Sequence, residues 1–263
     1  MLYGQPTKLI GGKGLSFGGG GAGFDILDLE PDGLWNPTLS YSGTALDATG
    51  IPDLSGNGRD LTYHTASGTE KCTAVEINGQ IFLDLVGSGF NGHFYSDEIG
   101  ALIPAGTNVP WTFAGVIQLD AINNPTIMSL SNVSVADSYQ KLQFLSDGSV
   151  LMENKNTSAT TVQFAPTVEH TVSTVHSYII RINGDGTASF WFDGFITDDE
   201  EPFAGPIFAN ARNYFSIGAY AFAINRNAIA EANGKFGLQF FKAAKLTNEE
   251  CDALATKMLE EWH

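Results

Sequence analysis

The chain has 263 residues, of which 43% are hydrophobic and 16% are charged, and its formal net charge is −16 at pH 7. This length suits one large β domain or two small ones, and the hydrophobic share is sufficient for a full core. A strongly negative balance argues against nucleic acid and other phosphate-rich partners, because such partners need a basic surface. The low charged fraction and the 30 Gly residues are typical of a β protein with many turns.

Residues 1–23 differ in composition from the rest of the chain. Within them, GGKGLSFGGGGAG holds eight Gly in thirteen positions. Such a stretch loses much backbone entropy on ordering and has few side chains to bury in return. Two interpretations stay open: a tail without fixed structure, and an assembly arm that becomes ordered on a partner or along a sheet edge.

The first residues, MLYGQPTKLIGG, contain no apolar signal core, and no run of about 18 apolar residues occurs that could cross a bilayer. We therefore expect a soluble protein that is made in a cytoplasm and is not inserted in a membrane. Cys72 and Cys251 lie far apart, and neither has a Cys or His at metal-ligand spacing. Two free buried thiols are expected in preference to one long-range disulfide.

From Phe24 onward, strand-like runs alternate with turn signals. Residues 141–154 predict a hairpin around Asp147-Gly148, and residues 178–194 predict another around NGDG at 183–186. Further strands are expected over 111–120, 214–222 and 235–244. Three groups are each expected to share one face of a strand: Trp111, Phe113, Ile117 and Leu119; Ala188, Phe190 and Phe192; Ser189, Trp191 and Asp193.

No helical pattern separates these strands, which favours an antiparallel sandwich over βαβ units. One helix is predicted at the C-terminus, where Thr247 and Glu250 form a capping box. Its apolar stripe follows the spacing i, i+3, i+4, i+7 and must be buried on the sandwich. The stripe consists of Cys251, Leu254, Ala255, Met258, Leu259 and Trp262.

The stretch DATGIPDLSGNGRDLT, residues 47–62, allows two interpretations. Asp53, Asn57 and Asp60 supply part of a Ca²⁺ ligand set, but Ca²⁺ takes six to eight oxygens. Gly56 and Gly58 instead suit a tight turn with positive φ angles. We expect a structural turn that fixes two strands near Trp35 and no bound cofactor, with Ca²⁺ as the weaker alternative.

Four stretches together resemble a known family. They are Trp35 with the D-L-S-G-N-G turn at 53–58, the strand WTFAGVIQLD, the hairpin IIRINGDGTASFWFDG with NYFSIGAY after it, and the closing GLQFFKAAKLTNEECDALATKMLEEW. Over residues 24–263 the chain resembles the concanavalin A-like, laminin-G-type jelly roll of tailed-phage virion proteins. The resemblance implies an all-β antiparallel sandwich with one C-terminal α-helix. It also implies glycan ligands on the concave face or the loop rim, and Ca²⁺ near that rim in some members.

Catalytic motifs are absent from the sequence, so we expect no enzyme. Hydrolases of this fold carry acids at alternate positions of one strand, as E-x-D-x-x-E, and no such segment occurs. The acids of residues 198–201 are consecutive and flanked by Gly194 and Pro202, which predicts an exposed loop. No G-x-S-x-G, H-E-x-x-H or phosphate-binding loop is present, and the five scattered His are expected at the surface.

A sugar site usually combines an aromatic face with amide or carboxylate hydrogen bonds. The candidates for glycan binding are Trp191, Asp193, Tyr220, Asn225 and Arg226. For Trp191 the alternative is packing beneath the C-terminal helix, since large aromatic side chains are more often buried than offered to ligands.

These observations lead to one main hypothesis. The chain is a non-enzymatic structural protein of a phage virion, as a head decoration, a fibre or a tail adhesin. It displays the jelly roll of residues 24–263 and attaches to other virion proteins through residues 1–23. Homo-oligomers or a symmetric array, and host surface glycans as ligands, are the expected partners. The alternatives are a stand-alone carbohydrate-binding module and, last, a glycoside hydrolase of the same fold.

Overall fold

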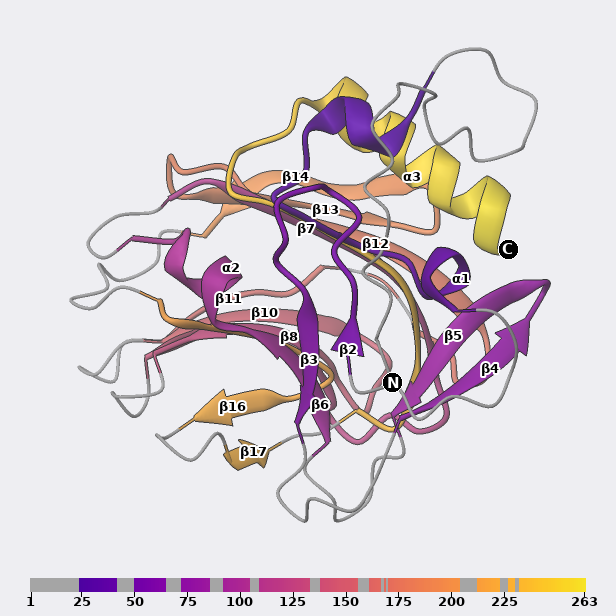
Figure 1. Ribbon diagram of the computed structural model, residues 1–263. Coiled ribbons are helices and arrows are strands. Elements are labelled where there is room, and N and C mark those ends of the chain that lie inside the picture. Colours follow the sequence, from indigo (N-terminus) through magenta and orange to yellow (C-terminus); the bar gives the residue numbers. More distant parts are fainter. Residues whose placement is uncertain are drawn as a thin grey trace.

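The computed structural model describes residues 24–41, 50–64, 72–85, 92–104, 109–132, 138–155, 161–166, 168, 170–203, 212–222, 227–229 and 232–263. These residues form two antiparallel sheets stacked face to face, with a long helix over the outer side of one of them (Figure 1). A small hairpin lies beside the other sheet. The predicted β-sandwich with one C-terminal helix is therefore confirmed.

Sheet I is the sheet beneath the helix. Its strands, in spatial order, are β14 (Phe195–Pro202), β13 (Thr187–Phe192), β12 (Val175–Ile182), β7 (Trp111–Leu119), β18 (Gly234–Lys242), β5 (Gln80–Leu85) and β4 (Thr73–Ile77), and β1 (Gly33–Trp35) also pairs with β18. Its centre is made by β7, β12 and β18, which are strands far apart in sequence, so that long-range pairing defines the fold.

Sheet II is the opposite layer. Its spatial order is β11 (Thr161–Phe164), β10 (Val150–Lys155), β9 (Tyr139–Phe144), β8 (Thr126–Ser131), β15 (Tyr214–Ile217), β6 (His93–Ser96), β3 (Leu61–His64) and β2 (Gly50–Ile51). The separate hairpin joins β16 (Tyr220–Phe222) to β17 (Asn227–Ile229). Figure 1 shows this hairpin on the side of sheet II that faces away from sheet I.

Two apolar layers hold the molecule together. Between the sheets, the ring of Phe215 in sheet II lies 5.8 Å from those of Trp35 and Phe113 and 5.5 Å from that of Phe241, all three in sheet I. The second layer lies on the outer face of sheet I, beneath helix α3 (Asn248–Trp262) and the 3-10 helix η1 (Ile26–Leu29). The centre of sheet I is thus buried on both faces, which is why all eight residues of β12 are buried.

Helix α3 begins and packs as its sequence predicts. The Glu250 amide donates to Thr247 Oγ1 (3.2 Å), and the Thr247 amide donates to Glu250 Oε2 (2.7 Å), which completes the capping box. The stripe is buried except for Leu259, which is half-buried. Both cysteines are free and buried, as expected, with Cys72 between the sheets and Cys251 beneath the helix.

Both hairpins predicted from turn signals are confirmed, as are the predicted faces of β7 and β13. β9 pairs with β10 around the Asp147-Gly148 turn, where Gly148 has a φ of 88°. β12 pairs with β13 around residues 183–186. The run predicted over 214–222 is instead two strands, because the chain turns at Gly218 (φ 87°) and leaves sheet II after β15.

Two further expectations are wrong. The acidic run of residues 198–201 is not a loop but part of strand β14, although it is exposed as expected. Short helical segments also interrupt the strands, namely η1, α1 (Pro37–Ser40) and α2 (Asp97–Ala101). None of the helices in the described ranges is long and apolar enough to cross a membrane.

Candidate functional site

The turn at residues 53–60 is held by one carboxylate. Asp53 Oδ1 accepts from the amides of Leu34 (3.0 Å) and Ser55 (2.9 Å), and Asp53 Oδ2 accepts from Ser55 Oγ (2.7 Å) and the Arg59 amide (3.0 Å). The Trp35 indole nitrogen donates to the Arg59 carbonyl oxygen (2.9 Å). The turn therefore ties β1 to the residues that lead into β3, which confirms that the stretch is a structural turn.

The residues that could have been Ca²⁺ ligands, Asp53, Asn57 and Asp60, form hydrogen bonds within the turn instead. The Asp53 oxygens are saturated by four donors, and the side-chain nitrogen of Asn57 donates to the Pro31 carbonyl oxygen (3.0 Å). Asp60 Oδ1 accepts from the Asp53 amide (2.8 Å). Gly56 and Gly58 have φ values of 87° and 72°, as a tight turn requires. Across the described residues, no group of three His, Cys, Asp or Glu side chains could hold a metal ion.

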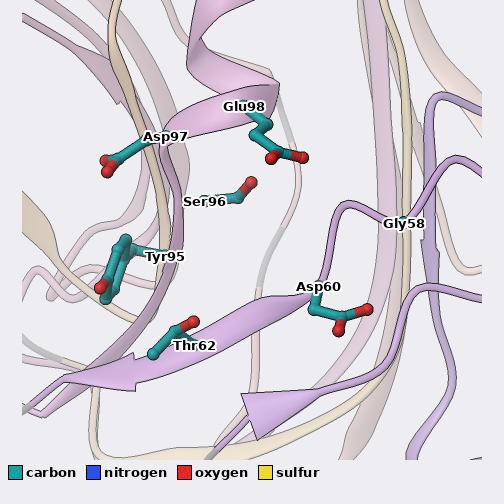
Figure 2. Close-up of a pocket in the computed structure, with 7 residues that line it drawn as sticks. All are labelled: Gly58, Asp60, Thr62, Tyr95, Ser96, Asp97 and Glu98. Atoms are coloured by element: carbon teal, nitrogen blue, oxygen red, sulfur yellow. The ribbon is translucent and has the colours of Figure 1, made fainter.

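An open pocket of about 280 Å³ lies beside this turn (Figure 2). Its walls come from the turn itself, from the neighbouring strands β3 and β6 of sheet II, and from the first turn of α2. The lining residues are Gly58, Asp60, Thr62, Tyr95, Ser96, Asp97 and Glu98. Three residues with carboxylates and three with hydroxyl groups therefore line one pocket near the edge of sheet II.

Local structure explains how these side chains come together. Thr62 and Tyr95 are cross-strand partners in the β3–β6 pair, so they lie next to each other although they are far apart in sequence. Ser96 ends β6 and caps α2, where its Oγ accepts from the Ile99 amide (3.3 Å). Asp97 and Glu98 occupy the first turn of α2, where the helix dipole favours negative charge.

Tyr95 gives the pocket an aromatic wall. Its ring stacks on that of Tyr214, with centroids 5.2 Å apart and planes 14° apart. The His64 ring meets Tyr95 edge-on at 6.1 Å. Contacts on two sides limit the movement of this half-buried ring, so that a ligand would meet a preorganised surface.

The lining chemistry selects a class of ligand. Carboxylates only accept hydrogen bonds when ionised, and hydroxyl groups both donate and accept. The pocket therefore matches a molecule rich in hydroxyl or amino donors. Three carboxylates within a chain of net charge −16 oppose an anionic ligand.

Trp191, the predicted glycan platform, does not reach solvent. The side chain is fully buried beneath α3, and its indole nitrogen donates to Asp252 Oδ1 (2.8 Å). The Arg181 guanidinium lies 4.9 Å from the centre of the indole ring. The interpretation as a platform is therefore wrong, because a ligand cannot stack on a ring whose faces are covered, and the packing alternative is confirmed.

Among the other predicted glycan residues, Asp193 lies away from the pocket. Asp193 lies in the turn between β13 and β14 with a φ of 47°, and its Oδ1 accepts from the Ser177 amide (2.9 Å). Tyr220 begins β16, beside sheet II, and its side chain is not among the described ones. Asn225 and Arg226 lie outside the described residues altogether. The structure thus places Asp193 and Tyr220 on different layers of the sandwich.

Histidines are buried where surface positions were expected. His93, His170 and His176 are 0%, 3% and 5% exposed. The Thr171 amide donates to His176 Nε2 (3.3 Å), so Nδ1 carries the proton and donates to Asp193 Oδ2 (2.8 Å). Burial, reinforced by His176, lowers the pKa of His170 to about 3. This cluster has the character of a buried structural network.

The comparisons with known proteins show a shared fold. A scan against protein-family models and a search of curated proteins each found no match. Among solved structures, the Botulinum Neurotoxin Type G Receptor Binding Domain is similar, with a TM-score of 0.58, 14% identity, and coverage of 87% of this chain and 51% of that chain. The binding domain of Paraclostridial Mosquitocidal Protein 1 has a TM-score of 0.56, 13% identity, and coverage of 86% of this chain and 52% of that chain.

The CBM40 of Ruminococcus gnavus IT-sialidase, bound to α2,3-sialyllactose, aligns with a TM-score of 0.47, 14% identity, and coverage of 57% of this chain and 83% of that chain. The chain spans about half the length of the two toxin domains. At these identities the toxin matches establish a common β-sandwich fold, and the function has to be argued from the chain's own residues.

Proposed function

We propose that the chain is a non-enzymatic carbohydrate-binding module that takes a neutral or amino-bearing saccharide in the pocket beside α2. The observation that carries this proposal is that carboxylate and hydroxyl residues, including Tyr95, line one open pocket of about 280 Å³. Sugar sites commonly pair an aromatic face with a few polar groups that fix orientation. The likeness in fold to two toxin binding domains is consistent with a binding role.

The negative charge of the pocket restricts the class of saccharide that it can bind. A carboxylate or sulfate on the saccharide would come close to Asp60, Asp97 and Glu98. Two unit charges of the same sign 4 Å apart repel by about 4 kcal/mol at a surface-like effective dielectric constant. Hydroxyl or ammonium groups on the saccharide instead donate to the same carboxylates. We therefore propose selectivity for uncharged or amino sugars over sialylated and sulfated ones.

A glycan array with the full chain tests the proposal. The expected result is binding to neutral or amino-bearing glycans that Glu98→Gln weakens by about tenfold, the effect of losing one charge-assisted hydrogen bond. Glu76→Gln is the matched control, because Glu76 is exposed on β4 of sheet I, away from the pocket. An array without binding, or equal effects of the two variants, would contradict the assignment. Reducing ends released from a bound glycan would favour the hydrolase alternative.

The virion setting remains a prediction that rests on the sequence resemblance. In that setting the module is displayed on a phage particle, and residues 1–23 attach it to other virion proteins. Mass spectrometry of purified particles tests it, and absence of the chain from them would count against it. Glycan binding by the pocket does not depend on this outcome, so the two proposals can fail separately.

A further inference from the structure

Strand β14 forms one end of sheet I and is exposed along its whole length. Within the described residues it pairs with β13 only, so its other side presents backbone groups without a neighbouring strand. All eight of its residues are exposed except Asp198, which is half-buried. Such an edge is a ready template for another strand.

The side chains of β14 divide into an apolar and an acidic part. Phe195 is 73% exposed and Ile196 is 41% exposed, so the start of the strand offers two apolar side chains to solvent. Residues 198–201 are four consecutive acids. Asp199 Oδ1 lies 3.3 Å from Arg181 Nη2, and Glu200 Oε1 lies 3.5 Å from Lys245 Nζ, so part of the negative charge is offset.

The other sheet ends that the structure describes are less suited to a charged partner. β4 (Thr73–Ile77) carries one acid, β11 (Thr161–Phe164) carries none, and β2 (Gly50–Ile51) is two residues long. Near the end of β14, Glu200 has a φ of 53° and Pro202 lacks an amide hydrogen, which both interrupt regular pairing. Regular backbone pairing is therefore confined to residues 195–199, and the exposed Glu201 side chain lies at the end of this edge.

The complementary segment is at the other end of the chain. Residues 1–23 contain Lys8 and Lys13 and no acid, within a protein that has 29 Asp and Glu. Leu9 and Ile10 lie between the two lysines. A basic segment with an apolar centre matches an edge that is apolar and then acidic. Phe195 is 73% exposed, so this apolar ring is available for contact with an added strand.

We propose that residues 7–13 of one copy add as an extended strand to residues 195–199 of a second copy. Backbone hydrogen bonds would supply the pairing, and one of the two lysines, which lie five residues apart, would reach the acidic half of β14. The donor segment and the acceptor edge are different parts of the chain, so the contact is head-to-tail and generates rings or open arrays. This inference does not rest on glycan binding, because the pocket lies at an edge of sheet II.

Cysteine trapping on the full chain tests the contact. One preparation carries Ile10→Cys and the other carries Thr197→Cys, and the native Cys72 and Cys251 are buried and do not compete. The expected result is a disulfide-linked dimer that forms on mixing. The matched control replaces Thr197→Cys with Glu260→Cys, on the exposed side of α3. Cross-linking no greater than in this control would overturn the proposal. A third preparation carries both substitutions in one chain, and a disulfide that forms only within that chain and never between chains would also overturn it.

Charge reversal gives a second measurement that does not depend on new thiols. Glu201→Lys and the double variant Lys8→Glu/Lys13→Glu should each weaken self-association by roughly 3- to 10-fold at low salt, as exposed ion pairs do. Combining all three changes should restore association, and Glu260→Lys should leave it unchanged. Sedimentation velocity measures each variant. A chain that stays monomeric at every concentration, or an unaffected Glu201→Lys variant, would refute the docking.

Discussion

Replacing Trp262 by Ala should remove the main anchor at the end of helix α3. The indole is 1% exposed and packs edge-on against Phe82, with ring centroids 5.0 Å apart and planes at 86°. Gly237 lies directly beneath the ring, and a Cβ placed there would be 2.5 Å from Trp262 Cζ3. The backbone of β18 thus approaches the indole more closely than any side chain would allow.

The expected cost follows from this packing. Truncating a buried Trp to Ala usually costs about 3–5 kcal/mol, because transfer energy is lost and a cavity remains. For a chain of this size each kcal/mol lowers Tm by about 2–4 °C, so Tm should fall by roughly 6–20 °C. Gly237→Ala is the matched variant, because the added methyl group pushes against the same ring from the strand side. It should also destabilise, and Trp262→Ala should relieve part of that effect.

Thermal and urea unfolding followed by far-ultraviolet circular dichroism measure these changes without relying on Trp fluorescence. The urea midpoint should fall while the slope stays constant, since the same surface is exposed on unfolding. A Tm within about 2 °C of the parent would refute the reasoning. It would mean that the last turns of α3 separate from sheet I at no cost and that the second apolar layer does not depend on them.

Three further predictions concern polar networks. Burial lowers the pKa of His170 to about 3, whereas the unfolded imidazole titrates near ~6.5. The folded state therefore takes up this proton less readily than the unfolded state. The free energy of unfolding that neutral His170 contributes is fully present above pH ~6.5, and it declines by up to ~1.4 kcal/mol per pH unit as the pH falls toward 3. His170→Gln should remove this part of the decline in urea midpoint, and an unchanged pH profile would contradict it. Arg181→Met should cost about 3 kcal/mol in urea unfolding, because the buried guanidinium donates to the Leu246 carbonyl oxygen (3.1 Å) and Ser189 Oγ (2.9 Å); a parental midpoint would show that these bonds add no stability. Asp53→Ala should lose about 2 kcal/mol by the same measurement, since four donors lose their acceptor, and Asp53→Asn should lose less.

The sequence predicted most of the fold because its signals are local. The Asp147-Gly148 turn, the alternation along β7 and the capping box of α3 each need only a few neighbouring residues. The short helices were missed for a related reason. Asp25 and Ser96 are N-caps, but the four or five helical residues after each show no apolar periodicity to detect. A search for caps alone would have found α2, with Asp97 and Glu98 after Ser96.

The candidate site was harder to predict because it depends on strand pairing. Thr62 and Tyr95 face each other only through the β3–β6 register, which no local pattern specifies. The prediction that Trp191 is a glycan platform was wrong for a different reason. Trp191 alternates correctly with Phe190, but both faces of sheet I are buried at β13, so a residue opposite the central core is still inside the molecule. Alternation separates the two faces of a strand without saying which of them meets solvent.

Negative charge acts on an approaching ligand in two ways that salt can separate. The net charge of −16 repels anions over the whole surface, but this field is screened within about 8 Å at physiological ionic strength. Asp60, Asp97 and Glu98 act at contact distance, where mobile ions screen less effectively. A preference for neutral over sialylated glycans that survives a tenfold increase in salt therefore originates in the pocket. A preference that disappears with salt is a property of the whole acidic surface, and Glu98→Gln would then leave the ratio of the two affinities unchanged.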